Sequence, residues 1–381
     1  MDKTKENNII NFPDNNKTKK KNFSKFYILI LIILIVIIVS FFNGKKSFVS
    51  TDAVNADTIS ILSTENYCFS AYKEGYIFAK DGKISCFNTN QQLQWEVKSS
   101  KTAPTVVSNE NYVLTYYKKD KLAVVTNGIK TRKISTDGNV IFGSVNKNGY
   151  VTLLIEEDGF KCQLAVYDKK GKLKYKWHNS EKYITSAYLS DNNKTLVVTE
   201  LNLHDTGVVS NILIGDIRKE LKFDEISLND DVICDLKFIS KNKFIVVLDS
   251  KTVCYSTKKH KKWEIDYSSE NLYTYDISDT NYISLVFGKD DSALSDSCVW
   301  IYNGKGKRTG VYESDKRIYK VDMQNKTSLI AYDREFEIIN SNGKVISDAM
   351  LNVDIHDSIF IGNRRCALIL SGSGASLIKP E

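Results

Sequence analysis

The chain has 381 residues, 26% of them charged, and a formal net charge of +7. This length suffices for one large domain or two ordinary ones. Most of the positive charge lies in the first 25 residues, and the sequence from Asp57 onward is close to neutral. Binding to a phosphate backbone requires concentrated positive charge, so the composition argues against a nucleic-acid partner.

Residues 1–25 are rich in Asn and Lys and show no apolar period, which predicts a disordered tail. Several lysines stand directly before the following apolar run: Lys17, Lys19, Lys20, Lys21 and Lys25. By the positive-inside tendency they place the N-terminus in the cytoplasm, although Lys45 and Lys46 reduce the asymmetry.

Residues 26–43 predict a single transmembrane helix. The run from Phe26 to Phe42 contains no charged residue and is long enough to cross a bilayer. A cleaved signal peptide is the alternative, but its apolar part is shorter and a cleavage site follows it closely, whereas here the first suitable site is at Ala56. We therefore expect an uncleaved anchor in the cell membrane, with the C-terminal domain outside the cell.

A linker without a strong period is predicted for residues 44–56, and an all-β domain for residues 57–381. The domain consists of short β-branched and aromatic runs separated by Gly, Asn, Asp or Lys turns, as in YVLTYYKKDKLAVVTNG. No long segment has the 3.6-residue period of a helix.

One sequence element recurs along this domain: an alternating strand, a polar turn that often contains Gly-Lys, and a short basic strand. Clear copies are CFNTNQQLQW, VYDKKGKLKYKW, VCYSTKKHKKW, IYNGKGKRTG and IINSNGKVIS; weaker copies are VVTNGIKTRKI and LIGDIRKELKF. The repeat units end near residues 97, 134, 178, 223, 265, 311 and 346. This spacing, with four strands per unit, is typical of propeller blades.

Two segments remain outside these seven units. Residues 352–379 contain three further strands, and residues 57–63 contain one spare strand before the first unit. Since a closed ring leaves no exposed sheet edge, we predict that these strands combine into an eighth blade. A seven-bladed ring with one leftover edge strand is the alternative.

The repeats resemble those of the PQQ-like propeller superfamily, whose blades carry an A-x-D-x-x-T-G-x-x-x-W pattern. Ala165, Asp168, Gly171 and Trp177 match it most closely, although Trp177 stands two positions late. Partial matches occur at Asn88 with Trp95 and at Asn340 with Gly343. The resemblance implies that the Gly forms the turn between the outer strands and that the Trp docks on the next blade.

The whole layout resembles a family of unknown function that comprises membrane-anchored PQQ-like β-propeller proteins of Gram-positive bacteria. This resemblance implies a fold rather than an activity.

The acidic loop at residues 289–297 is the strongest candidate for a metal site. Asp290, Asp291 and Asp296 could supply oxygen ligands to calcium, but the loop lacks the regular order of a calcium-binding loop. We interpret it as a solvated loop. A quinoprotein site would be accompanied by vicinal cysteines, which this sequence lacks, so we expect no metal and no cofactor.

Four histidines are present: His178, His204, His260 and His356. None lies near another in sequence, so no local zinc motif exists. The pairs His204–Asp205 and His356–Asp357 could each act as a base with its orienting carboxylate. Turn capping by the aspartate is the favoured interpretation. We expect no catalytic residue and no enzymatic activity.

The seven cysteines include no CxxC motif. Most lie within apolar runs, where a cysteine behaves as a small hydrophobic residue, so we interpret them as buried thiols. Disulfides between Cys68 and Cys86 or between Cys234 and Cys254 stay open on spacing alone.

These observations favour an extracytoplasmic propeller that acts as an interaction platform for an envelope protein or for cell-wall material. The alternative is a ligand-binding sensor or an enzyme that uses the central channel.

Overall fold

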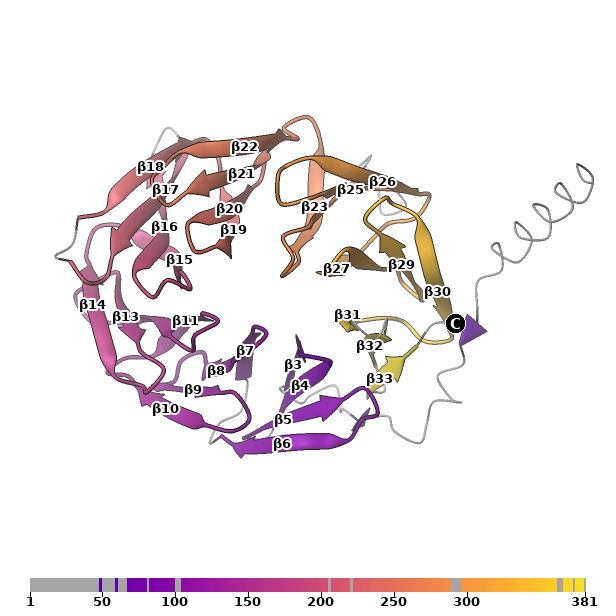
Figure 1. Ribbon diagram of the computed structural model, residues 1–381, viewed down its shortest axis with the longest axis horizontal. Helices are drawn as coiled ribbons and strands as arrows, with labels where there is room; N and C mark the ends of the chain where they lie inside the picture. The colour runs from indigo at the N-terminus through magenta and orange to yellow at the C-terminus, as the bar shows by residue number, and fades with distance from the viewer. Residues whose placement is uncertain are drawn as a thin grey trace, which may run out of the picture. The chain divides into compact units, whose positions relative to one another are not determined.

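The computed structural model describes residues 48–49, 59–60, 67–80, 82–99, 104–204, 207–219, 222–288, 296–361, 366–372 and 374–379. These residues form eight β-sheets that are arranged in a ring (Figure 1). The predicted eight-bladed, all-β propeller is therefore confirmed, and the seven-bladed alternative is wrong.

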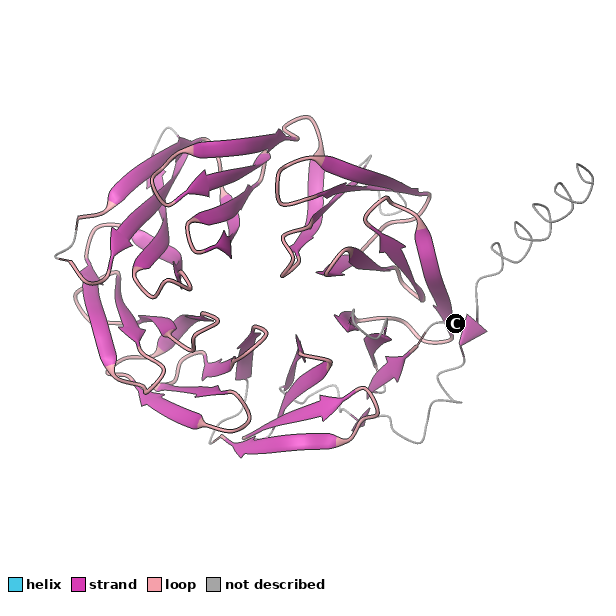
Figure 2. Cartoon of the chain, in the orientation of Figure 1, coloured by secondary structure: helices cyan, strands magenta, loops and turns pink. Residues whose placement is uncertain are grey.

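Figure 2 shows that strands and loops alone build the part of the chain that the structure describes. Within that part, no helix has the length and apolar character needed to cross a membrane. The predicted tail, 1–25, and the predicted span, 26–43, lie outside the described residues.

Blades 1 to 4 take consecutive segments of the chain. Blade 1 contains β3 (Tyr67–Tyr72), β4 (Gly75–Lys80), β5 (Lys83–Asn88) and β6 (Leu93–Lys98); blade 2 contains β7 (Pro104–Ser108), β8 (Val113–Tyr117), β9 (Leu122–Thr126) and β10 (Thr131–Ser135). Blade 3 contains β11 (Val140–Val145), β12 (Val151–Ile155), β13 (Cys162–Tyr167) and β14 (Leu173–Asn179); blade 4 contains β15 (Tyr183–Leu189), β16 (Thr195–His204), β17 (Gly207–Asp216) and β18 (Asp224–Asn229).

Blades 5 to 7 continue in the same way, and blade 8 closes the ring. Blade 5 contains β19 (Ile233–Ser240), β20 (Lys243–Leu248), β21 (Lys251–Ser256) and β22 (Lys261–Asp266); blade 6 contains β23 (Asn271–Ile277), β24 (Ile283–Gly288), β25 (Ser297–Tyr302) and β26 (Arg308–Ser314). Blade 7 contains β27 (Lys320–Gln324), β28 (Thr327–Ala331), β29 (Glu335–Asn340), β30 (Val345–Leu351) and β1 (Phe48–Val49); blade 8 contains β31 (Asp357–Ile361), β32 (Cys366–Ser371), β33 (Gly374–Ile378) and β2 (Ile59–Ser60).

The predicted unit ends fall one to three residues before the ends of the outermost strands, except in blade 7, where 346 is five residues short of Leu351, and in blade 4. There the copy ending at Phe223 covers the end of β17 and the turn before β18, and the last strand ends at Asn229. Because β16 and β17 are long strands, this blade contains more residues than the average repeat.

Each blade is antiparallel and runs from the channel to the rim. Consequently the first and third turns of a blade lie at one end of the ring. The second turn and the crossing to the next blade lie at the other end. These two sets of turns form the two faces of the propeller.

The eighth blade closes as predicted from the sequence. β2 pairs antiparallel with β33, with Ile59 opposite Ala375 and Ser60 opposite Gly374. The interface between blades 8 and 1 is also packed, since the fully buried Tyr76 of β4 joins a cluster with Ile361 and Leu368.

One strand lies in the segment predicted as a linker. Phe48 and Val49 form β1, which pairs in parallel with Met350 and Leu351 of β30. A two-residue strand is too short to produce a sequence period, so the pattern gave no signal for it. The exposed edge of β30 supplies the pairing groups.

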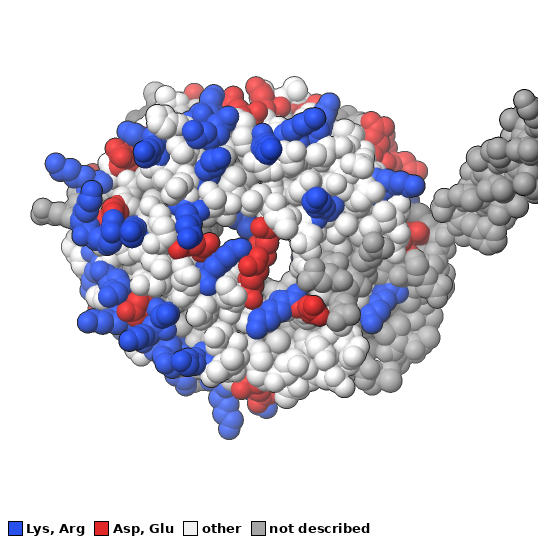
Figure 3. All heavy atoms as spheres, in the orientation of Figure 1, with Lys and Arg blue, Asp and Glu red and all other residues white. Residues whose placement is uncertain are grey.

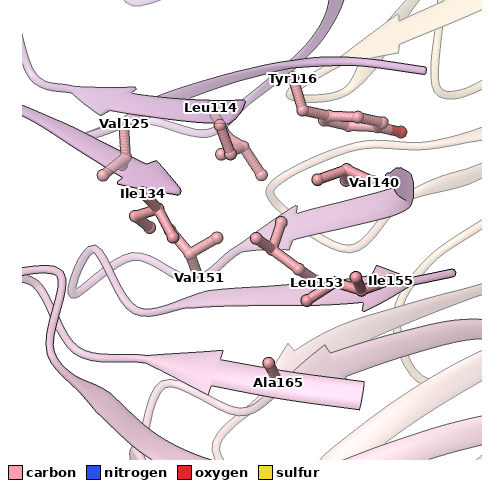
Figure 4. Close-up of a cluster of buried hydrophobic side chains, with 10 residues drawn as sticks. Leu114, Tyr116, Val125, Ile134, Val140, Val151, Leu153, Ile155 and Ala165 are labelled. Atoms are coloured by element: carbon pink, nitrogen blue, oxygen red, sulfur yellow. The ribbon is translucent and has the colours of Figure 1, made fainter. Parts of the chain in front are cut away.

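The hydrophobic core is a series of clusters, each lying between two neighbouring blades. Figure 4 shows the cluster between blades 2 and 3, in which Leu114 and Tyr116 face Leu153 and Ile155. The middle strands are covered on both sides, so β12 is buried at every position. The outermost strand β14 alternates between exposed and partly buried residues instead.

Turns at the rim repeat one local structure. In blade 3 the Asp168 carboxylate accepts hydrogen bonds from the backbone N–H groups of Lys170 and Lys172, at 2.9 and 3.0 Å. Gly171 completes the turn with a φ of +79°, which glycine adopts without steric cost. Asp168 and Gly171 therefore have the turn-forming role that the resemblance implied.

Aromatic side chains dock the outer strand of one blade on the next, as the resemblance also implied. Trp263 of blade 5 donates from Nε1 to the carbonyl of Gly304 in blade 6, at 3.2 Å. A Cβ added to Gly306 would stand 2.7 Å from the Trp263 ring. Trp177 of blade 3 packs on Phe223 of blade 4, with ring centroids 4.9 Å apart.

The late position of Trp177 has a structural explanation in the register. In blade 1 Trp95 pairs with Cys86, and in blade 5 Trp263 pairs with Cys254. The equivalent position in blade 3 is occupied by Tyr175, opposite Val166. Trp177 lies two residues later in the same strand, so its side chain points to the same side of the sheet as that of Tyr175.

Candidate functional site

The mouth of the central channel is the first candidate site. A cavity of about 600 Å³ opens there, lined by the innermost strands and the first turns of blades 1, 2, 6 and 7, with single residues from blades 5 and 8. Figure 3 shows the opening from this face, with acidic and basic side chains at its margin.

Two carboxylates on neighbouring blades form the polar wall of this cavity. Asp276 on β23 accepts a hydrogen bond from the backbone N–H of Met323 on β27, at 2.5 Å. Asp322 on β27 accepts one from the N–H of Phe360 on β31, at 2.8 Å. The innermost strands have an unpaired edge toward the channel, and each aspartate satisfies a donor on the edge of the next blade.

These acids influence one another. Burial raises the pKa of Asp322 to about 7, and the negative charge of the neighbouring Asp276 adds to the shift. Burial also raises the pKa of Asp235 on β19, with a further contribution from Asp276. Asp322 therefore holds its proton far more tightly than an exposed aspartate.

A basic group in the lining of this cavity is also engaged within the protein. Lys237 of β19 donates to the carbonyl of Ile277 and pairs with Asp279, with 3.3 Å between Nζ and Oδ1. These charged groups form ion pairs with one another or hydrogen bonds with the backbone of a neighbouring blade. Their contacts indicate a structural role, in which they join blades 5 to 8.

The first turns of the blades are tied together around the ring. Asn111 donates to the carbonyl of Lys147 in the next blade, at 3.0 Å, and Asn148 donates to that of Asp191, at 2.7 Å. Thr280 donates in the same way to Asn325. These bonds hold the turns of successive blades in fixed relative positions.

The structure describes only some of the sequence candidates for metal binding and catalysis. Asp290 and Asp291 lie outside the described residues, and only Asp296 of that loop is described. In the described part of the chain, no group of three His, Cys, Asp or Glu side chains has a geometry that could hold a metal ion.

The histidine candidates also lie apart. Asp357 begins β31, pairs with Lys320 and accepts a hydrogen bond from the backbone N–H of Ser358 in the same strand, so it neither caps a turn nor orients His356. His260 is exposed in its turn, as expected. The strand β16 ends at His204, and Asp205 lies outside the described residues.

Burial of the cysteines is confirmed for Cys86, Cys162, Cys254 and Cys366. Cys68 is partly buried, whereas Cys234 is exposed, contrary to the prediction of a buried thiol. Both members of each suggested pair, Cys68 with Cys86 and Cys234 with Cys254, carry free thiols, so neither disulfide forms in this structure.

The two faces of the propeller carry opposite charge. We call the face with the first and third turns the basic face; its described turns contain Lys73, Lys130, Lys147, Lys169, Lys170, Lys172, Lys194, Arg218, Lys219, Lys222, Lys241, Lys258, Lys259, Lys305, Lys307, Lys326 and Lys344, against Glu74, Glu110, Asp168, Asp191 and Asp279. Figure 3 shows this face, where Lys and Arg are spread over nearly all the described blades.

We call the opposite face the acidic face. Its described turns and crossings contain Asp120, Asp137, Glu156, Glu157, Asp158, Glu181, Asp230, Asp231, Asp249, Glu270, Asp296, Asp315, Asp333 and Asp354, against Lys118, Lys119, Lys121, Lys161, Lys182, Lys316, Arg317 and Arg334. The near-neutral total of the domain thus conceals a strong separation of charge.

A hollow of about 850 Å³ lies on the acidic face between the turns of blades 6, 7 and 8. Tyr319 and Met350 line it and are exposed over 53% and 37% of their surface. Arg317 stacks over Tyr319, 5.6 Å from the ring centroid. Tyr, Met and Arg are the residue types enriched at the centres of protein interfaces.

Comparison with known proteins places the chain in a family. The model of a family of unknown function, DUF5711, matches residues 45–379. The chain belongs to this family. No curated protein matches the sequence.

Solved structures are similar to this DUF5711 chain at low sequence identity. BamB from Moraxella catarrhalis is 10% identical with a TM-score of 0.49, over 84% of this chain and 98% of BamB. Apo AztD from Citrobacter koseri is also 10% identical with a TM-score of 0.49, over 76% of this chain and 86% of AztD.

The aspartates of the DUF5711 channel wall, Asp276 and Asp322, were missed by sequence reasoning. Each stands near the end of an innermost strand, in YTYDIS and KVDMQN. An acidic residue at a similar place in two successive repeats is the signal that could have identified them, because a propeller brings its innermost strands together.

Proposed function

We propose that this protein is a membrane-anchored, extracytoplasmic propeller that serves as an interaction platform for an envelope protein, without enzymatic activity. The observation that carries the proposal is the hollow on the acidic face, where the exposed Tyr319 and Met350 lie beside Arg317. Charged residues of both signs surround them, and two of these residues, Lys316 and Arg334, pair with acids of the same lining. Such a surface suits a partner with a complementary apolar projection and a polar margin.

The anchor in this proposal is the uncharged run at residues 26–43. Five residue steps separate Asn43 from Phe48 of β1, a reach of at most about 17 Å. Phe48 pairs with Met350, which lines the hollow on the acidic face. A membrane anchor would therefore keep the propeller within reach of other membrane-bound proteins.

Site-specific photo-crosslinking tests the interaction role. A photo-reactive phenylalanine at Tyr319 is compared with one at Leu93, which is also 53% exposed but lies at the end of β6 on the basic face. We expect one defined envelope protein to be crosslinked at position 319 and not at 93, and the additional substitution Met350→Asp to abolish the adduct. Equal adducts at both positions, or none, would refute the proposal.

Topology is tested separately with a membrane-impermeant maleimide. Cys234 has an exposed thiol, whereas Cys86, Cys162, Cys254 and Cys366 are buried. Intact cells should yield labelling at Cys234 that is lost in Cys234→Ser, and the protein should stay with the membrane after an alkaline wash. Labelling that requires cell lysis would contradict an extracytoplasmic domain.

A second candidate function is a ligand-binding sensor or enzyme that uses the channel, since the cavity of about 600 Å³ contains the Asp276 and Asp322 carboxylates. We favour the interaction role because both carboxylates bind backbone N–H groups of neighbouring blades. Native mass spectrometry of the full chain would support the channel function if a bound small molecule disappeared in Asp276→Asn.

A further inference from the structure

The basic face presents a ring of lysines that lack ionic partners. Within the described residues, Lys130, Lys170 and Lys305 are among fourteen of its seventeen basic side chains that form no ion pair; the exceptions are Lys147 with Glu110, Arg218 with Asp216, and Lys259 with Asp224. Unpaired charge of one sign over a surface raises the local concentration of opposite charges.

A groove on this face brings two of these lysines together. It has a volume of about 470 Å³ and runs across the turns of blades 1 to 4, with Lys73 and Lys169 among its lining residues, beside Lys147, which pairs with Glu110. Asn127 also lines it. Its side-chain oxygen accepts two backbone N–H groups of its own turn, at 3.0 and 2.8 Å, which leaves its amide N–H groups for a ligand.

We propose that the basic face binds a linear polyanion, a chain of regularly spaced groups such as phosphates, and that the groove at Lys73 and Lys169 is its main contact. Lysine contributes a mobile point charge without the fixed geometry of arginine. A surface with many separate lysines and a single arginine in its described turns therefore suits repeated anionic groups better than one small anion.

A protein partner fits this face less well. The large apolar side chains exposed there are Leu93, Ile129 and Leu173, which begin strands or occupy turns on three different blades. No described aromatic residue on this face is highly exposed, whereas protein interfaces are built around buried aromatic anchors.

A lipid surface also fits less well. The exposed large apolar side chains described on this face, Leu93, Ile129 and Leu173, are scattered over three blades rather than gathered into a patch that could enter a bilayer.

The test measures binding of fluorescently labelled long-chain polyphosphate to the full-length protein in phosphatidylcholine nanodiscs. We expect binding at low salt that weakens steeply as salt rises, because bound counterions are released. The variant Lys73→Glu with Lys169→Glu should bind at least about tenfold more weakly. The slope of log K against log salt should fall by about 2.

The matched control reverses two exposed lysines on the acidic face, Lys118→Glu with Lys121→Glu. It makes the same change in net charge and should alter polyphosphate affinity by less than about twofold. Equal losses in the two variants would overturn the proposal, since binding would then follow net charge alone. Absence of binding at low salt would also overturn it.

Vesicles that contain phosphatidylglycerol form the second arm. Co-flotation of the nanodisc-held protein with these vesicles, without polyphosphate binding, would assign the face to a lipid surface and overturn the proposal. This inference deepens the proposed platform role by naming a second partner, but its readout is independent of the crosslink at Tyr319. Each proposal can therefore fail while the other holds.

Discussion

Neighbouring blades are joined by different chemistry at the rim and at the channel. At the rim, aromatic side chains pack on glycine turns of the next blade, as Trp263 does on Gly306. At the channel, aspartates accept backbone N–H groups from the next blade, as Asp322 does from Phe360. Apolar packing is insensitive to pH, whereas a buried carboxylate is not. We call these contacts the rim joint and the channel joint, and they should therefore respond to different perturbations.

Removal of the rim strand of blade 8 should have the largest effect. Deletion of residues 1–66 removes β2 and leaves the edge of β33 unpaired, while the channel strand β31 is unchanged. Two residue pairs and the closed rim are lost, so we expect a decrease in unfolding free energy of about 3 kcal/mol.

The control is deletion of residues 1–50, which removes β1 and keeps β2. Chemical denaturation of the two fragments measures the difference. Equal unfolding free energies would show that β2 does not stabilise the ring.

A methyl group at the rim joint should have the next largest effect. In Gly306→Ala the new Cβ would stand 2.7 Å from the Trp263 ring, at a φ of +74°. Backbone strain costs about 1 kcal/mol and the displaced indole adds about 1–2 kcal/mol. Thermal unfolding should show the decrease in stability.

Gly159→Ala is the matched control for that variant. Gly159 has a φ of +83°, but nothing lies within 4 Å of an added Cβ. It should show the backbone strain alone. If the two alanine variants were equally stable, the contact between Trp263 and the turn would not contribute to blade docking.

The sequence predicted the rim better than the channel. Rim turns are local, so Asp168, Gly171 and the strand-ending tryptophans repeat visibly along the chain, and the ring closure followed from counting these repeats. The role of Asp322 depends on Phe360, which belongs to another blade. No local sequence pattern indicates that contact.

The separation of charge between the faces was also hidden from the sequence. Lysines in the first and third turns alternate along the chain with acids in the second turns and crossings, so composition averages them to near neutrality. The lysines and the acids lie on opposite faces because the strands of each blade are antiparallel. The acidic face and its hollow could not be inferred from the total charge for the same reason.

The channel joint gives the smallest expected effect, and its sign depends on pH. The pKa of Asp322 is raised in the folded protein to about 7, so the folded state binds this proton more tightly than the unfolded state. Its stabilising contribution is complete below about pH 4 and is lost as pH rises through 7. The full linkage value does not apply because Asp322 is only partly buried and is screened by solvent, and we expect a loss of about 1–2 kcal/mol.

Asp322→Asn should flatten this dependence. The amide oxygen can still accept from the N–H of Phe360, and the amide carries no charge to repel Asp276. Urea unfolding at pH 5 and pH 8 should show a smaller decrease for the variant than for the natural protein.

The control Asp216→Asn concerns a carboxylate whose pKa is lowered to about 2 by the hydrogen bonds from Arg218. Its stabilising contribution is complete at both pH values, since it is lost only as pH falls toward 2. The substitution should therefore lower stability equally at pH 5 and pH 8 and leave the slope unchanged. If Asp322→Asn also left the slope unchanged, the channel carboxylates would not exchange a proton between pH 5 and 8, and the two joints would not differ in their response to pH.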